Sequence, residues 1–326
     1  MADDPTMSRR RMVGGTATLA AASLTSAAAK GRETMTENST PIEQLVDPTD
    51  KYPKPPFERQ SQPWPGLASK MSPRPDHGET SYNGSGRLVG RRALITGGDS
   101  GMGRAAAIAY AREGADVAIN YYPTEEPDAQ EVIALIKAEG RKADAIPGDL
   151  RDERFCERLV QQAIEALGGL DIIVNNAARQ QSRRSILDVS SEDFDATMKT
   201  NIYAPFWIIK AALPHLQPGS VIIGTSSEQA YDPSPELYDY AQTKAATMNY
   251  VKSLAKQLGP KGIRVNAVAP GPIWTPLQVS GGATMEKLEK FGGQTPLGSI
   301  YVQLAAADAS YANGQVYGSS GGSGQP

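Results

Sequence analysis

A short apolar run and a glycine-rich turn follow one another in Ala93-Leu94-Ile95-Thr96-Gly97-Gly98-Asp99-Ser100-Gly101-Met102-Gly103, and residues 104–112 continue as a helical pattern. Glycines let the backbone turn tightly and approach a pyrophosphate, and the free N–H groups of the following helix favour an anion. Strand-to-helix turns often contain glycine without binding a nucleotide, so the stretch has to be judged with its neighbours. The spacing is Gly-x-x-x-Gly-x-Gly, not the Gly-x-Gly-x-x-Gly of larger dinucleotide-binding domains.

Short apolar runs alternate with amphipathic stretches along the rest of the body. The expected strands are residues 93–95, 116–122, 143–146, 170–175, 221–225, 263–268 and 315–317. The expected helices are residues 104–112, 127–139, 152–167, 192–213, 237–258 and 283–290. This alternation predicts a single α/β domain with a Rossmann-like, doubly wound, parallel seven-stranded sheet covered by helices on both faces. In such a sheet ligands bind beyond the carboxyl ends of the strands.

The composition excludes several function classes. The 326 residues include 33 basic and 36 acidic side chains, a net charge of −3 that offers no footprint for nucleic acid. Cys156 is the only cysteine, and His77 and His215 are the only histidines. They cannot form an intramolecular disulfide or a structural zinc site, so we expect no metal. Chemistry must come from Tyr, Lys, Ser, Asn and Asp.

The first 86 residues divide into two segments. Residues 1–29 contain Ser8-Arg9-Arg10-Arg11, a weakly apolar stretch and Ala27-Ala28-Ala29, and they resemble a twin-arginine export signal too short to span a membrane. The alternative is a flexible Ala-rich terminus. Residues 30–86 are polar and rich in proline, which predicts an extended arm. Its aromatic residues predict docking onto the body or a neighbouring subunit, the alternative being a solvated linker.

Polar side chains gather where ligands are expected. Tyr240 and Lys244 are four residues apart on a predicted helix, so phenol and ammonium share a face. An ammonium favours the phenolate, which would bring the tyrosine pKa from about 10 toward neutrality and allow general acid–base chemistry. Ser227 follows the fifth strand and Asn175-Asn176-Ala177 closes the fourth. Each serine alone could be a turn or a helix cap.

Together these motifs resemble the short-chain dehydrogenase/reductase family. Residues 87–322 carry Thr-Gly-x-x-x-Gly-x-Gly, Asn-Asn-Ala, Ser and Tyr-x-x-x-Lys in the family's order and spacing. A narrower resemblance rests on the long arm, residues 97–101, Ala230-Tyr231 and residues 270–275. These features resemble the bacterial subgroup described as NAD(P)-dependent aldehyde reductases and glucose/ribitol dehydrogenase-like general stress proteins. We therefore interpret residues 87–326 as an NAD(P)-binding catalytic domain.

The resemblance implies hydride transfer between NAD(P)H and an aldehyde, ketone or alcohol. It makes Tyr240 the general acid or base, Lys244 its activator and the ribose ligand, and Ser227 the ligand of the substrate oxygen. Asn201 would hold a water in a proton relay. The implied cofactor-binding residues are Gly97, Asp99, Ser100, Gly101, Met102, Gly103, Asn120, Tyr121, Asp149, Leu150, Asn176, Ala177, Tyr240, Lys244, Pro270, Gly271, Ile273 and Thr275. The alternative is a non-catalytic nucleotide-binding regulatory or structural subunit.

The residues after the second strand favour NADP, with NAD possible. Asn120-Tyr121 stands where NAD-preferring members carry an acid for the ribose 2′-hydroxyl, so no carboxylate there repels a 2′-phosphate. No arginine follows the strand, and Ser100 occupies a loop position that is basic in some NADP enzymes. The residues thus permit NADP without requiring it.

Two departures from the family pattern concern Ala178, which replaces a glycine, and the passage from Gly298 to Ser299. The family usually has about ten more residues after Gly298, which open the next helix, so either the start of that helix is deleted or the segment is absent from the given sequence. A true deletion would alter the substrate lid and the dimer face. The subgroup resemblance implies a homotetramer acting on a small molecule, with no nucleic acid or membrane partner after signal cleavage. The leader implies periplasmic export of the folded, loaded enzyme, or a cytoplasmic location if it is not used.

Overall fold

The computed structural model describes residues 53–292 and 301–319. Within them, seven parallel strands form one sheet in the order β3-β2-β1-β4-β5-β6-β7. The strands are β1 Arg92–Thr96, β2 Asp116–Tyr121, β3 Ala143–Pro147, β4 Ile172–Asn175, β5 Val221–Thr225, β6 Arg264–Pro270 and β7 Val316–Ser319. The Rossmann-like sheet expected from the sequence is confirmed. The direction of chain progression reverses between β1 and β4, which is where such sheets bind ligands.

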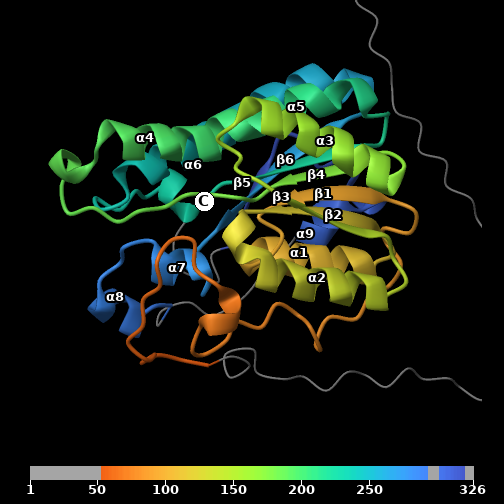
Figure 1. The fold of residues 1–326 in the computed structure, drawn as a ribbon. Coiled ribbons are helices and arrows are strands. Elements are labelled where there is room, and N and C mark those ends of the chain that lie inside the picture. Colours follow the sequence, from red (N-terminus) through yellow and green to blue (C-terminus); the bar gives the residue numbers. More distant parts are fainter. Residues whose placement is uncertain (1–52, 293–300, 320–326) are drawn as a thin grey trace, which may run out of the picture. The chain divides into compact units, whose positions relative to one another are not determined.

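Helices cover both faces of the sheet (Figure 1). The helices are α1 Gly101–Arg112, α2 Glu126–Ala138, α3 Glu153–Leu167, α4 Ser191–Met198, α5 Ala204–Ala212, α6 Tyr238–Leu258, α7 Pro276–Ser280, α8 Met285–Glu289 and α9 Tyr301–Ala305. Buried side chains of α1, α2 and α9 form one core, and those of α3, α5 and α6 form the other. Along β1, Ala93 and Ile95 enter the first core while Leu94 enters the second, because side chains alternate along a strand.

The helix expected over residues 192–213 is interrupted. The structure has α4, a π-helical turn over Lys199–Tyr203, and then α5. Pro205 stands in the first turn of α5 and has no N–H to donate to the carbonyl of Asn201, so the regular helical bond is lost at that point. The chain nevertheless continues in the same direction, and Asn201 is the buried residue of the turn.

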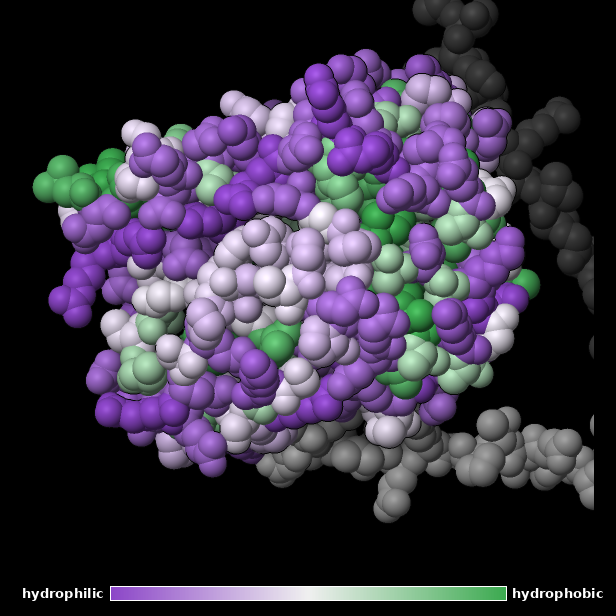
Figure 2. Space-filling model, viewed as in Figure 1, coloured by the Kyte–Doolittle hydropathy of each residue, from purple (hydrophilic) through white to green (hydrophobic). Residues whose placement is uncertain are grey.

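Five of the eight large hydrophobic side chains that are exposed in the described residues belong to the segments around α4, α5 and α6. They are Ile186, Leu187, Tyr203, Phe206 and Tyr238. Figure 2 shows hydrophobic surface at the end of α4 that the turn Ile186–Asp188 precedes, bordered by hydrophilic residues. This side of the molecule therefore carries more apolar surface than a solvated helical layer needs.

The described part of the arm, residues 53–86, contains one short 3-10 turn, Ala68–Lys70, and packs against the body of its own chain. Phe57 stacks on Trp274 with ring centroids 4.7 Å apart, and the Phe57 amide donates to the carbonyl of Glu289 in α8. The leader over residues 1–29 and the departure after Gly298 lie outside the described residues. In the part of the chain that the structure describes, no helix combines the length and apolar character needed to cross a membrane.

Candidate active site

The turn between β1 and α1 has a backbone that only glycine allows. Gly97 and Gly101 adopt positive φ angles of 61° and 50°. A Cβ on Gly103 would lie 2.0 Å from the carbonyl oxygen of Gly97, so any side chain there would break the turn. The glycine spacing noted in the sequence thus has a steric cause at three positions.

The first turn of α1 faces the same pocket. Ser100 is the N-cap residue, and its side chain makes no capping hydrogen bond to the turn that follows. The first N–H groups of a helix have no intrahelical acceptors, and the helix dipole makes this end favourable for anions. Together with the glycine turn, this arrangement fits the pyrophosphate of a dinucleotide.

Side chains at the ends of β1 and β4 hold that turn in place. The Thr96 hydroxyl accepts hydrogen bonds from the amides of Asn176 and Ala177 at 3.0 and 3.1 Å. The Asn176 amide group donates to the carbonyls of Thr96 and Gly97 at 3.2 and 3.1 Å. The Asn-Asn-Ala segment is therefore a brace for the glycine turn as well as part of the pocket wall.

Tyr240 and Lys244 lie one turn apart on α6 and both line the pocket. Their side chains are almost fully buried, with exposed fractions of 7% and 3%. The Lys244 ammonium donates to the carbonyl of Thr225 at 2.8 Å, and its Nζ lies 5.2 Å from the centre of the Tyr240 ring. The end of β5 and the face of α6 thus fix the lysine beside the phenol.

Burial dominates the protonation of this pair. It raises the pKa of Tyr240 to about 12, although a hydrogen bond with the Ser227 hydroxyl acts in the opposite direction. Burial also lowers the pKa of Lys244 to about 7. The expectation that the ammonium brings the tyrosine pKa toward neutrality is thus not met in this structure, because burial disfavours both charged forms. At neutral pH the phenol is protonated.

Ser227 combines the two roles that the sequence left open. It is the N-cap residue of the 3-10 turn Glu228–Ala230, where its hydroxyl accepts from the amide of Gln229 at 3.2 Å. The same side chain is buried and hydrogen-bonded to Tyr240. The cap fixes the hydroxyl, and the fixed hydroxyl orients the phenol.

The side chain of Asn201 is fully engaged with the protein. Its amide oxygen accepts from the backbone N–H of Arg179 at 2.7 Å, and its amide nitrogen donates to the carbonyl of Arg179 and the Thr243 hydroxyl, both at 3.0 Å. Thr243 directly precedes Lys244 on α6. Asn201 therefore connects the π-helical turn to the catalytic helix, while its neighbour Thr200 reaches the pocket wall.

The other end of the pocket contains carboxylates. Asp149 is bound by the Arg151 side chain, which holds the Asp149 pKa below its usual range against the opposing effect of burial. Asp99 and Glu125 also line this region, and burial raises the pKa of both above the usual range, joined by repulsion from Asp128 at Asp99 and by repulsion from Asp99 at Glu125. The sequence argument found no carboxylate at the end of β2, yet the fold brings Glu125 and Asp99 to it, where burial favours their protonated forms.

The pocket brings most of the expected residues together. Those lining it are Gly97, Asp99, Ser100, Gly101, Met102, Asn120, Tyr121, Asp149, Leu150, Asn176, Ala177, Tyr240, Lys244 and Thr275. Those outside its lining are Gly103, Asn201, Ser227, Pro270, Gly271 and Ile273. Pro270 ends β6 and Gly271 donates to the carbonyl of Ser319, so this pair joins strands rather than contacting the pocket.

Sequence reasoning missed several lining residues. One group follows β2 and consists of Tyr122 and Glu125, and a second lies in the arm and consists of Trp64, Pro65 and Gly66. The others are Gly148, Ala178, Thr200, Thr225 and, in α7, Pro276, Leu277 and Ser280. Trp64 packs on Tyr122 with ring centroids 5.1 Å apart. The only sequence signal was the presence of aromatic residues in a proline-rich segment, which indicates docking but not where it occurs.

Comparisons with known proteins agree with this geometry. A family model described as enoyl-(acyl carrier protein) reductase matches residues 97–323. The uncharacterized oxidoreductase YghA of Escherichia coli is 55% identical over 287 residues, covering 85% of this chain and 98% of YghA. The chloroplastic NADPH-dependent aldehyde reductase 1 of Arabidopsis thaliana is 40% identical over 281 residues, covering 81% of this chain and 97% of that protein.

A solved structure matches the same body. A short-chain dehydrogenase from Burkholderia cenocepacia in complex with NADP has a TM-score of 0.64 and 34% identity, and the match covers 72% of this chain and 98% of that chain. The chain belongs to the short-chain dehydrogenase/reductase family of oxidoreductases. This confirms the family resemblance inferred from the motifs.

Proposed function

We propose that this protein is an NADP-dependent oxidoreductase, able to use NAD as well, that reduces an aldehyde or ketone or oxidises the corresponding alcohol or polyol. The observation that carries the proposal is the burial of Tyr240 and Lys244 in the same pocket as the glycine turn and the first turn of α1. The NADP complex of the Burkholderia relative and the name of the Arabidopsis reductase support the choice of cofactor.

The pocket residues would have distinct roles in cofactor binding and proton transfer. The glycine turn and α1 hold the pyrophosphate, and Asn120, Tyr121 and Asp149 face the adenosine end. When bound, the nicotinamide supplies a hydride to the carbonyl carbon. Tyr240 donates its phenolic proton to the carbonyl oxygen, which becomes the alcohol hydroxyl. The resulting phenolate is stabilised by the Lys244 ammonium and by the Ser227 hydroxyl.

The raised pKa of Tyr240 supports reduction at neutral pH. A general acid must carry its proton before the reaction, and a phenol with a pKa of about 12 is fully protonated at pH 7. In the opposite direction the phenolate would be required, and it is scarce at that pH. We therefore propose that Tyr240 enters carbonyl reduction as a protonated general acid near neutrality.

Replacing Tyr240 by Phe tests the proposal. The variant should lower kcat for carbonyl reduction by roughly 100- to 10,000-fold, because the general acid is lost while the pocket keeps its shape. NADPH binding, measured by isothermal titration calorimetry, should stay within about twofold of the wild type. The substrate panel consists of small aldehydes, diketones and sugars, each assayed with NADPH and with NADH.

Tyr238→Phe provides the matched control on the same helix. Tyr238 is 46% exposed and does not line the pocket, so this variant should keep wild-type activity. Unchanged turnover in Tyr240→Phe would contradict the role of Tyr240 as general acid. A wild type that binds NADPH but turns over no member of the panel would favour the alternative, a nucleotide-binding regulatory or structural subunit.

We also propose that the protein is a homotetramer and that residues 1–29 direct export of the folded enzyme to the periplasm. The exposed hydrophobic side chains around α4, α5 and α6 support self-association. The arginines and the Ala-x-Ala pattern of the leader support export. Detection of only uncleaved chain, confined to the cytoplasm, would refute the export proposal.

A further inference from the structure

Six residues of the arm form a closed loop at the pocket. In this strap loop, Gln62–Leu67, the side-chain oxygen of Gln62 accepts from the Leu67 amide at 2.8 Å and its side-chain nitrogen donates to the Leu67 carbonyl at 3.1 Å. The two ends of the loop are thus joined by one side chain. Between them, Trp64, Pro65 and Gly66 all line the pocket.

The strap loop is attached to both sides of the pocket. On one side, the backbone N–H of Gln62 donates to the carbonyl of Val279 in α7 at 2.9 Å. A Cβ on Gly66 would lie 3.2 Å from the carbonyl oxygen of Pro276, so the loop backbone packs directly on α7. On the other side, the Trp64 ring packs on the ring of Tyr122 just after β2.

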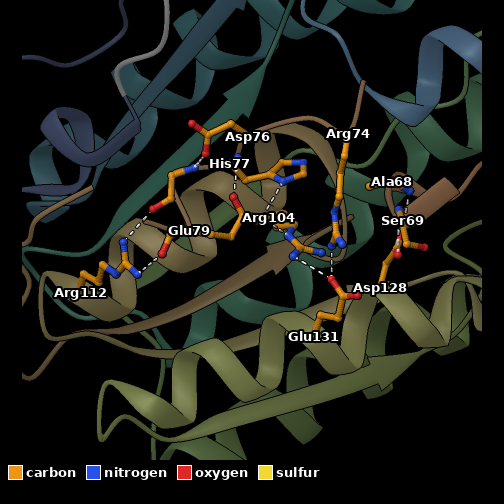
Figure 3. A network of polar contacts seen from close by, with 11 residues as sticks. Ala68, Ser69, Arg74, Asp76, His77, Glu79, Arg104, Arg112, Asp128 and Glu131 are labelled. Atoms are coloured by element: carbon orange, nitrogen blue, oxygen red, sulfur yellow. Dashed lines mark hydrogen bonds and ion pairs between the residues drawn. The ribbon is translucent and has the colours of Figure 1, made fainter. Parts of the chain in front are cut away.

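A buried carboxylate holds the segment that follows the loop. Asp128 near the start of α2 is fully buried and accepts from the amides of Ala68 and Ser69 at 2.6 and 3.3 Å (Figure 3). A buried carboxylate that lost these donors would be strongly disfavoured, so the contact fixes the arm firmly on α2.

Ion pairs and hydrogen bonds of two arginines fix the following part of the arm on α1 and α2. Arg104 of α1 is 2% exposed and donates to Glu79 of the arm and to Glu131 of α2, both at 3.0 Å (Figure 3). Arg112 of α1 donates to the arm carbonyls of Gly78 and Tyr82, both at 2.7 Å. Because buried polar groups are engaged on both sides, residues 68–82 of the arm are firmly docked and anchor one end of the strap loop.

We infer that the strap loop is a wall of the dinucleotide site and that Trp64 contacts the bound cofactor. This inference rests on the proposed function, since it concerns the same pocket. The loop reaches from Tyr122, at the adenosine end, to α7, beside Thr275. A ligand lying along the glycine turn would be covered by the strap loop and could leave only after the loop moves. The arm therefore slows cofactor release.

The extent of the sequence matches agrees with a role for the arm in this branch of the family. The match to YghA covers 85% of the chain. This share is larger than the share that residues 87–326 make up, so the match includes part of the arm. The match to the Burkholderia dehydrogenase covers 72%, a share that the body alone could supply. Relatives that match the catalytic body alone thus share the fold without the arm that lines the pocket here.

The test compares Trp64→Ala with Arg59→Ala in the full chain. Trp64→Ala should raise the Kd for NADPH roughly tenfold, which corresponds to about 1.4 kcal/mol, and the change should lie mainly in the dissociation rate. Calorimetry gives the Kd and stopped-flow NADPH fluorescence gives the rate, so neither readout depends on turnover. Arg59 belongs to the arm, but its pairs with Glu286 and Glu289 are exposed and it does not line the pocket.

Gln62→Ala serves as a second variant, because it opens the strap loop without touching the pocket wall and should also speed release. Wild-type Kd and dissociation rate in both Trp64→Ala and Gln62→Ala would overturn this inference alone. An equal effect of Arg59→Ala would also overturn it, since any loosening of the arm would then suffice. A wild type that binds neither NADPH nor NADH would overturn the proposed function together with it.

Discussion

Tyr240 and Lys244 show how burial sets the chemistry of single residues. Both side chains are buried in the pocket wall beside the end of β5, where burial disfavours the charged form of each. A neutral phenol is ready to donate a proton, but a neutral amine cannot stabilise the phenolate that results. The pair therefore works best when the tyrosine keeps its proton and the lysine has gained one.

This balance predicts the pH dependence of reduction. Burial lowers the pKa of Lys244 to about 7, so its charged form is present below that pH and is lost above it. Tyr240 stays protonated up to about pH 12. We expect kcat for reduction at saturating NADPH to be highest in the acidic range and to decline as the pH rises through about 7. A pH profile that is flat between pH 6 and pH 9 would contradict this assignment.

The segment between β2 and α2 bears on the choice between NADP and NAD. Glu125 accepts from the Tyr122 amide at 3.1 Å and shares the pocket with Asp99. Burial, and then repulsion from Asp99, raises the Glu125 pKa to about 9. The carboxyl is therefore protonated at neutral pH and ionises as the pH approaches 9. A neutral acid can donate a hydrogen bond to a phosphate, whereas the ionised form repels it.

Glu125→Gln should therefore change the pH dependence of cofactor preference. In the wild type, ionisation of Glu125 at rising pH should raise KM for NADPH more than KM for NADH, because only NADPH carries the 2′-phosphate. In the Glu125→Gln variant, the ratio of KM for NADPH to KM for NADH should change less with pH than in the wild type. The measurement is both KM values between pH 6 and pH 9, with NADH as the internal control. Identical ratios for wild type and variant at every pH would rule out a role for Glu125.

The elements also show how far sequence alone can predict this structure. The parallel sheet followed from runs such as Val221–Thr225, which are apolar on both faces, and Tyr240 and Lys244 followed from helical spacing. The break in the helix at Pro205 depends on one missing N–H, a local signal that the surrounding apolar pattern obscured. Glu125 and Trp64 could not be placed in the site because their positions depend on tertiary packing, which leaves no periodic pattern.

At the scale of the whole molecule, the two helical layers differ in what they leave exposed. The arm lies against α1 and α2, where its contacts cover that side of the sheet. Around α4, α5 and α6, by contrast, Phe206 is 60% exposed and Tyr203 is 47% exposed. Exposed aromatic residues gathered on one side of a molecule are typical of an interface. The arm and the assembly of subunits would thus occupy different sides of the sheet.

Phe206→Asp tests this division. A charge in an apolar contact between subunits would be desolvated without a partner, so the proposed tetramer should dissociate into smaller species. Light scattering after size-exclusion chromatography measures the mass, and NADPH affinity should remain close to that of the wild type because Phe206 does not line the pocket. Val89→Asp is the matched control, since Val89 is 69% exposed but lies away from α4, α5 and α6 in the sequence and just before β1. A wild type that is monomeric at micromolar concentration, or a tetramer that persists in Phe206→Asp, would show that these aromatic residues serve another purpose.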